Sequence, residues 1–425
     1  MPEPAEQCEE VAPWTPNSPL FRRRWVILAL LFTITVINFI DRQTLSVLAP
    51  VIRNIFHLSN QQYGRIVAAF QFGMMSGEFP MGSLMDRWGT RLGLSFAVLW
   101  WSTATGAQVF ARSGVQFGAL RYWMGTGECG NFSGGVKTVT RLFSRTERTL
   151  AIGIFNSGTM IGATIAPPLI VFLLSRYGFR TAFLIPAFLG FLWLIPWWIF
   201  YKSEPEPTTP VGQIPASLKS LLSDSSTWAV MSCRFFNGPV LQFYWYWIPS
   251  YLYSVRHLSM LQIGFLGWIP YLLGDIGGVL GGSAAGILLR RGVPVAKTRK
   301  LLMYASSIFC LISFFVPYAD GKVTAIAMIG IALTADNFLS ANMYGAVTDL
   351  FPDQNVGRAT GLTGVAGGLS GLLFPLLTGY LVDRFSYTPA FLMVAVMPLM
   401  GTFMLFLFGL KYRRLSQKGG MEETT

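Results

Sequence analysis

Five charged side chains interrupt runs of residues that are otherwise strongly apolar. Asp41 and Arg42 lie in one run, Arg121 and Glu128 in another, and Asp336 in a third. Charged groups are costly inside a membrane span and usually mark a function or a buried ion pair. An arginine fork binds both oxygens of a carboxylate and never loses its charge. A carboxyl away from water favours its neutral form. These residue types therefore predict binding of a small organic anion, coupled to protons.

The spacing of these residues supports a shared site. Arg121 and Glu128 are seven residues apart, which is two helical turns, so both face the same way about 10 Å apart along the axis. Asp41 and Arg42 lie far along the first run and reach a similar depth if the chain alternates direction. The alternative is a static salt-bridge network that only holds helices together.

Other polar residues inside apolar runs are weaker candidates. A sugar needs hydrogen bonds and flat apolar faces, which Tyr and Trp side chains supply. The candidates for contacts with substrate hydroxyls are Asn156, Tyr344 and the run Tyr244-Trp245-Tyr246-Trp247. An aromatic belt at the membrane interface is the alternative for the aromatic run that includes Tyr244. Asp275, which lies beside glycine, either binds substrate or pairs with Arg234.

The elements that must position these side chains are membrane-spanning helices. Hydrophobic residues make up 52% of the 425 residues and charged residues 12%, against about 25% charged residues in soluble domains. A spanning helix needs about 20 mostly apolar residues, and twelve runs meet this condition. They cover residues 24–47, 60–85, 91–111, 115–142, 149–175, 180–201, 226–254, 261–289, 300–317, 322–349, 357–382 and 387–411.

The polar segments divide the chain into two six-helix bundles. Residues 202–225 contain Pro, Ser, Thr and charges of both signs, and we expect them to link a bundle over 24–201 to a second over 226–411. Residues 1–23 and 412–425 are predicted to be cytoplasmic tails. The first twenty residues lack the basic start and short apolar core of a cleavable signal peptide.

Positive charge predicts the orientation. An even number of spans places both ends of the chain on one side, and cytoplasmic loops carry the excess of Lys and Arg. Four basic residues lie inside runs, and with a cytoplasmic N-terminus twenty of the 32 Lys and Arg fall in inner loops and tails. The eight in outer loops are Arg53, Arg65, Arg112, Arg176, Arg180, Arg256, Lys322 and Arg384. This distribution explains the net charge of +12 without nucleic acid.

An internal repeat relates the two bundles. Gly153 and Pro167 recur as Gly361 and Pro375 at an offset of 208, which also carries Glu128 onto Asp336. Equal orientation of the two copies indicates a parallel repeat about the membrane normal.

Metal, cofactor and enzyme chemistry are not indicated. The four cysteines form no CxxC pair, and His57 and His257 have no cysteine partner nearby, so we expect neither disulfides nor a metal site. No nucleophile–base pair or phosphate-binding loop is visible, so no cofactor and no catalytic residue is predicted.

The loop after the second run carries a recognisable motif. Gly82, Asp86, Arg87, Gly89 and Arg91 match the signature loop of the major facilitator superfamily, which the chain resembles. The resemblance implies twelve helices in two pseudo-symmetric bundles. The glycine permits close helix contact, and the aspartate can pair with a basic group at a neighbouring helix end. Gly82, Asp86, Arg87 and Arg91 are therefore predicted to control the conformational change.

A narrower resemblance is to the anion:cation symporter branch, and within it to bacterial hexuronate transporters. It rests on Asp41-Arg42, on Arg121 with Gly127-Glu128, on Gly153 to Gly158, and on Pro270 to Asp275. It implies proton-driven import of a sugar acid through a cavity lined by the first and fourth helices. Glu128 and Asp41, with Asp336 by the repeat, would exchange protons, and Arg42 and Arg121 would hold the substrate carboxylate.

Three positions depart from sugar-acid relatives. Met74 stands where some carry a tyrosine, Thr159 where some carry a glutamine, and Gly364 where aldonate carriers have a substrate asparagine. Thr159 is accordingly a candidate substrate contact, and the departures favour uronates over aldonates.

Several hypotheses remain open. The first is a proton symporter for a monovalent sugar acid. The others are a carrier of another organic anion (an aldonate, an aromatic acid or a small dicarboxylate) and a sensor that does not transport its solute. A monomer in a bacterial inner membrane is expected from the resemblance and the short loops.

Overall fold

The computed structural model describes residues 23–202, 218–351 and 353–408. The predicted N-terminal tail up to residue 22, the tail 412–425 and residues 203–217 of the predicted linker lie outside this part of the chain. The described residues form helices joined by short turns and contain no strand.

The first half of the chain contains α2 (Arg24–Val47), α3 (Ala49–Phe56), α4 (Asn60–Ala107), η1 (Gln108–Phe110), α5 (Gly114–Leu142), α6 (Arg145–Tyr177) and α7 (Phe179–Phe200). The second half contains α8 (Leu218–Leu222), α9 (Ser225–Ser254), α10 (Met260–Leu266), α11 (Ile269–Arg290), α12 (Val295–Phe309), η2 (Cys310–Tyr318), α13 (Lys322–Leu350), α14 (Asp353–Arg384) and α15 (Tyr387–Phe408). We call α2–α7 the N-terminal half and α9–α15 the C-terminal half.

Each predicted apolar run is helical over most of its length. Eight described segments are long and apolar enough to cross a membrane. Helix breaks occur near prolines, which lack the backbone N–H that continues a helix. The first run ends where α2 ends, at Val47, and a separate short helix with Pro50 in its first turn follows Leu48. The eighth run divides at Gly267–Trp268, before Pro270. The end of the ninth run is a 3₁₀ helix that contains Pro317.

Gly89 divides α4 into the second and third predicted spans. Its backbone has φ 72° and ψ 165°, a combination that is essentially restricted to glycine. The second glycine of the signature loop is therefore required by the sharp turn that reverses the chain.

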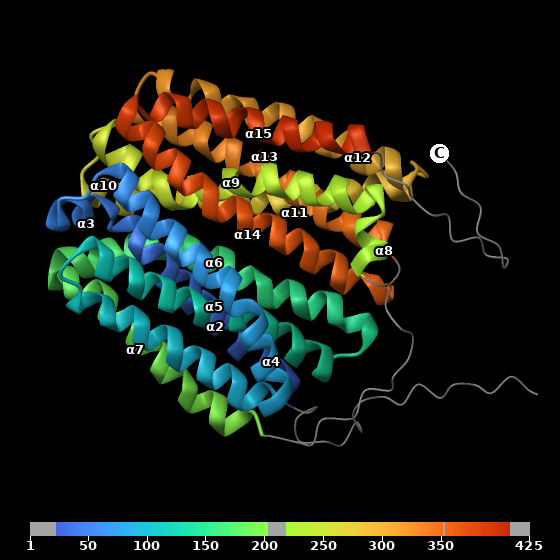
Figure 1. The fold of residues 1–425 in the computed structure, drawn as a ribbon, viewed down its shortest axis with the longest axis horizontal. Helices are drawn as coiled ribbons and strands as arrows, with labels where there is room; N and C mark the ends of the chain where they lie inside the picture. The colour runs from blue at the N-terminus through green and yellow to red at the C-terminus, as the bar shows by residue number, and fades with distance from the viewer. Residues whose placement is uncertain (1–22, 203–217, 352, 409–425) are drawn as a thin grey trace, which may run out of the picture.

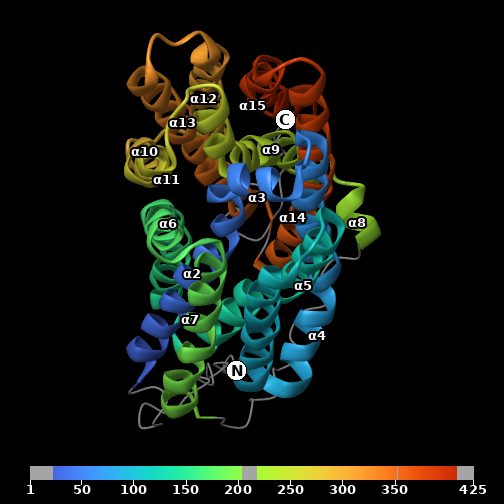
Figure 2. The same cartoon turned by 90° about the vertical axis from the view of Figure 1, so that its left-hand side faces the viewer.

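The two halves form two layers of helices (Figures 1 and 2), which touch through specific helix pairs. The cross-layer pairs include α4 with α14, α2 and α3 with α9, and α6 with α10 and α11. We call the end of the molecule that carries α3 and α10 the clasped end; it lies at the left of Figure 1 and faces the viewer in Figure 2.

A carboxylate joins the halves at the clasped end. Asp383, near the end of α14, accepts hydrogen bonds from the backbone N–H groups of Asn60 (2.9 Å) and Gln61 (2.7 Å) at the start of α4. It also accepts one from the Asn60 side chain at 2.7 Å. The exposed N–H groups and the dipole make a helix N-terminus attractive to a negative charge, so Asp383 caps α4 from the opposite half.

Two glycines allow α4 and α14 to pack closely beside this cap. A Cβ atom on Gly64 would overlap the carbonyl oxygen of Pro375, and one on Gly379 would lie 2.6 Å from the carbonyl oxygen of Asn60. Backbone therefore packs directly on backbone where the halves meet.

At the opposite end, which we call the open end, glycines of both halves lie next to open space within the part of the chain that the structure describes. A Cβ atom added to any of six glycines there would meet no described atom within 4 Å. They are Gly82 on α4, Gly153 on α6, Gly282 and Gly286 on α11, and Gly361 and Gly364 on α14.

The clasped end also shows a second register of the internal repeat. His57-Leu58-Ser59 and His257-Leu258-Ser259 recur at an offset of 200. In both copies the histidine has a positive φ, and the serine forms a capping box with a glutamine three residues later. Identical turns in both halves extend the predicted repeat to the first two helices of each.

Candidate functional site

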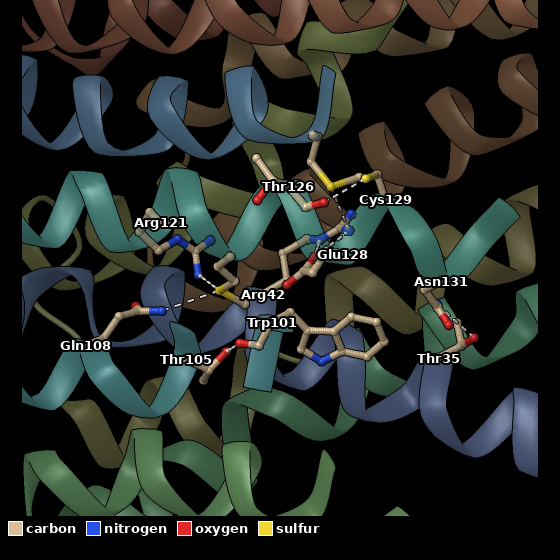
Figure 3. Close-up of polar contacts among 12 residues, drawn as sticks. Thr35, Arg42, Trp101, Thr105, Gln108, Arg121, Thr126, Glu128, Cys129 and Asn131 are labelled. Atoms are coloured by element: carbon tan, nitrogen blue, oxygen red, sulfur yellow. Dashed lines mark hydrogen bonds and ion pairs between the residues drawn. The ribbon is translucent and has the colours of Figure 1, made fainter. Parts of the chain in front are cut away.

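Arg42 on α2 and Glu128 on α5 form the ion pair at the centre of the candidate site (Figure 3). Nε and Nη2 of Arg42 donate to the same oxygen of Glu128, Oε2, at 2.9 and 2.7 Å. Glu128 is fully buried, and its other oxygen, Oε1, has no hydrogen-bond partner among the described residues. The ion pair ties α2 to α5 and joins two residues of the predicted shared site.

Arg121 lies on the same helix as Glu128 but has no carboxylate partner within the described chain. It is fully buried, and its Nη1 donates only to the sulfur of Met124 at 3.2 Å. Nε and Nη2 have no acceptor. The same sulfur accepts a hydrogen bond from Gln108 at 3.4 Å. Thioether sulfur is a weak acceptor, and a buried charge without strong acceptors is costly, so Arg121 is suited to receive an anion.

The Phe70 ring lies near both arginines. Its centroid is 4.5 Å from Cζ of Arg121 and 5.2 Å from Cζ of Arg42, which also lies 4.5 Å from the Phe39 ring. Cation–π attraction stabilises both guanidinium groups in a buried setting. Phe70 thus holds two like charges near each other without neutralising them.

Two further polar side chains of α2 are buried without partners. Neither oxygen of Asp41 and neither amide atom of Gln43 has a hydrogen bond in the described structure. One turn beyond Glu128, Nδ2 of Asn131 donates to Oγ1 of Thr35 at 3.1 Å and fixes α5 against α2. Asp41 therefore lies beside the ion pair, and its carboxyl group makes no hydrogen bond to the described residues.

Tyr244 and Tyr246, both in the predicted aromatic run of α9, have different surroundings. The Tyr244 hydroxyl bonds the Ser313 hydroxyl at 2.5 Å, inside its own half. The buried Tyr246 hydroxyl has no hydrogen-bond partner among the described residues and lies within electrostatic reach of Arg42 and Arg121. Two residues along a helix is a rotation of about 200°, so the two hydroxyls lie on different faces of α9.

Asp336 occupies the position in the C-terminal half that the repeat predicts. It is fully buried on α13, and neither oxygen has a hydrogen-bond partner. Arg234 lies close enough to act on its charge and stacks over the Tyr344 ring at 5.5 Å. Asp275 is partly exposed on α11, and no ion pair joins it to Arg234 among the described residues, so that predicted pairing is not formed.

The remaining candidates lie apart from the charge cluster. Asn156 is exposed on α6, and the Thr159 hydroxyl donates to the Asn156 carbonyl oxygen at 2.8 Å. No hydrogen bond joins either side chain to Arg42 or Arg121 in the part of the chain described. Tyr344 is 44% exposed.

The signature loop makes its contacts within the N-terminal half. Oδ1 of Asp86 pairs with Lys137 at 3.0 Å, but the aspartate side chain is 74% exposed, which makes the pair weak. Arg91 donates to the carbonyl oxygen of Trp198 at 2.8 Å and stacks on its ring. Arg87 is exposed.

Sequence reasoning missed several residues of this cluster. Gln43 and Gln108 carried a signal, because an amide inside an apolar run must find a partner. Phe70 and Met124 carried none, since aromatic and thioether side chains are ordinary in membrane helices. Tyr246 lies in the predicted aromatic run, but the aromatic sequence does not reveal the rotational phase of α9 that separates it from Tyr244.

Comparison with known proteins identifies the family of this chain. The family model described as Major Facilitator Superfamily matches residues 31–335 and 323–425. The hexuronate transporter of Escherichia coli K12 is 28% identical over 402 residues, covering 90% of this chain and 93% of that protein. The hexuronate transporter of Bacillus subtilis 168 is 30% identical over 387 residues, with 86% and 90% covered.

A solved structure shares the fold. The crystal structure of a bacterial homologue of the human lysosomal transporter Spinster, described as inward-facing and unoccupied, has a TM-score of 0.72 at 19% identity. It covers 91% of this chain and 95% of that one. With the family model matching most of the chain, this helical membrane protein belongs to the Major Facilitator Superfamily and is a transporter rather than an enzyme.

Proposed function

We propose that the protein imports a monovalent sugar acid, with a hexuronate as the first choice, by proton symport. The observation that carries this proposal is Arg121, a buried arginine whose one hydrogen-bond acceptor within the described chain is a sulfur atom. A carboxylate satisfies its two free nitrogens with charge-assisted hydrogen bonds. The hexuronate transporters that the chain resembles over most of its length support the sugar-acid class.

The ion pair supplies a route for coupling. While Glu128 is ionised, it holds Arg42 through two hydrogen bonds. A proton on Glu128 removes its charge and releases Arg42 to join Arg121 on the substrate carboxylate. Loss of that proton restores the negative charge of Glu128, which competes with the substrate carboxylate for Arg42 and favours release of the substrate.

Asp41 and Asp336 are the further candidates for proton exchange. An ionised carboxylate that is buried without hydrogen bonds is expensive, so each of these residues is suited to take up a proton. Asp41 is adjacent to Arg42 in the chain, and Asp336 is the counterpart of Glu128 in the other half.

Alternating access would be a rocking of the two predicted bundles, 24–201 and 226–411. With both termini cytoplasmic in a bacterial inner membrane, the clasped end is outside and the open end is inside. Breaking the Asp383 cap would open the outer end. At the open end, the glycines that lie next to open space would let α4 approach α14, and α6 approach α11, when that end closes.

Transport by purified protein in liposomes tests the proposal. Labelled galacturonate or glucuronate should accumulate above its equilibrium level under an inward proton gradient, and an uncoupler should abolish the accumulation. If folded protein takes up neither acid, the hexuronate assignment is wrong, and a binding screen of other organic anions becomes the next step. If uptake only equilibrates, the substrate class stands and symport does not.

A further inference from the structure

Gln242 lies on α9, four residues before Tyr246. The Tyr246 hydroxyl is within electrostatic reach of Arg42 and Arg121. Residues four apart lie on the same face of a helix, one turn from each other. Because α9 runs from the open end to the clasped end, Gln242 is one turn nearer the open end than Tyr246.

The internal repeat leads to the same residue. The offset of 200 that relates the two capping boxes carries Arg42 onto Gln242, and the offset of 208 carries Glu128 onto Asp336. At matching positions of the repeat, the N-terminal half thus has Arg42 and Glu128, and the C-terminal half has the neutral amide of Gln242 and the acid Asp336, on which Arg234 acts.

Gln242 has unused hydrogen-bonding capacity. It is partly exposed, and its Oε1 is buried and receives no hydrogen bond from any described residue. A carboxamide offers both an acceptor and donors, which suits neighbouring hydroxyl groups of a sugar. Gly371 on α14 leaves room for this amide, because a Cβ atom there would lie 2.6 Å from Nε2 of Gln242.

We propose that Gln242 determines specificity by binding the hydroxylated, uncharged end of the substrate while the arginines hold its single carboxylate. This inference rests on the proposed function. A diacid would place its second carboxylate against a neutral amide on the side of Asp336. Arg234, the cation of this half that acts on Asp336, lies two helical turns from Gln242 along α9. A second carboxylate beside Gln242 would therefore lose its hydration and gain no adjacent cation, which is costly. The asymmetry between the halves therefore selects a monoacid over a diacid.

The test measures how well unlabelled galacturonate and unlabelled galactarate each compete with the uptake of labelled galacturonate. Galactarate carries a second carboxylate, which galacturonate lacks. The wild type should favour galacturonate by about tenfold or more, because an unpaired buried charge costs at least about 1–3 kcal/mol. Gln242→Arg supplies the missing cation and should shift the galacturonate-to-galactarate ratio toward galactarate by about tenfold. Gln242→Ala and Gly371→Ala should both weaken galacturonate several-fold. Gln116→Arg, at an exposed glutamine of α5, is the matched control.

The galacturonate-to-galactarate ratio separates recognition from stability, because a variant that is only less well folded loses transport of both acids to the same extent. An unchanged ratio in Gln242→Arg that remains folded and transports galacturonate would overturn the inference and leave the proposed function intact. A wild type that takes up neither acid would instead refute the proposed function itself.

Discussion

Arg42 donates two hydrogen bonds to one oxygen of Glu128, while the other oxygen of the same carboxylate has no partner. A fork-to-fork pair would use both oxygens and resist separation more strongly. The observed pair neutralises both groups inside the protein but retains a free acceptor. Such a contact can be exchanged for a substrate carboxylate when Glu128 gains a proton.

Arg121 should be indispensable for substrate binding. Arg121→Gln removes the charge that has no carboxylate partner within the described chain, and hydrogen bonds to a charged group contribute about 1.5–3 kcal/mol each. We expect at least tenfold weaker galacturonate binding, measured by titration calorimetry. Arg121→Lys keeps the charge without the fork and should retain an intermediate affinity. Arg65→Gln, an exposed arginine of α4, is the control. Unchanged affinity in Arg121→Gln would remove this residue from the site.

The Tyr246 and Tyr244 hydroxyls form a matched pair of tests. Tyr246→Phe removes a buried hydroxyl that has no protein partner among the described residues, so it should weaken substrate binding by about fivefold and leave stability almost unchanged. Tyr244→Phe breaks the bond to Ser313 and should lower thermal stability with little effect on binding. If Tyr244→Phe weakens binding and Tyr246→Phe lowers only stability, Tyr244 is the substrate contact instead of Tyr246.

Asp383 should hold the clasped end together. Asp383→Ala removes three hydrogen bonds to a carboxylate at the start of α4, worth about 1.5–3 kcal/mol each. The population open at this end should rise by at least about tenfold. Spin labels at Val115 and Val323, which are 85% and 75% exposed, report the separation of the halves. Asp320→Ala, at an exposed acid of the same end, controls for charge. Identical distance distributions in the two variants would refute the clasp.

Gly89 should be needed for stability rather than for substrate recognition. With φ 72° and ψ 165°, Gly89→Ala should cost about 1–3 kcal/mol and lower the midpoint of thermal unfolding in detergent. Gly82→Ala is the comparison, because it lies in regular helix with open space around a Cβ atom. Equal midpoints for both variants would show that the turn tolerates a side chain.

The sequence predicts the helices and the charge cluster well, for a physical reason. Membrane spans need long apolar runs, and a charged group inside one must have a use, so Arg42, Arg121 and Glu128 stand out by residue type and position alone. Residue type and position alone do not predict contacts that depend on the rotation of a helix about its axis, or contacts between segments far apart in the sequence. The aromatic run of α9 does not separate Tyr244 from Tyr246, because this helix is buried on several faces. The cap of α4 by Asp383 joins residues more than 300 positions apart.

The most direct test of the account is proton-driven accumulation by Glu128→Gln in liposomes, compared with wild type. Glutamine keeps the size of the side chain and cannot ionise, so it neither holds Arg42 as an anion nor carries a proton. We predict that the variant exchanges internal for external galacturonate but accumulates none under an inward proton gradient. Accumulation equal to that of the wild type would contradict the central claim and transfer the coupling role to Asp41 or Asp336.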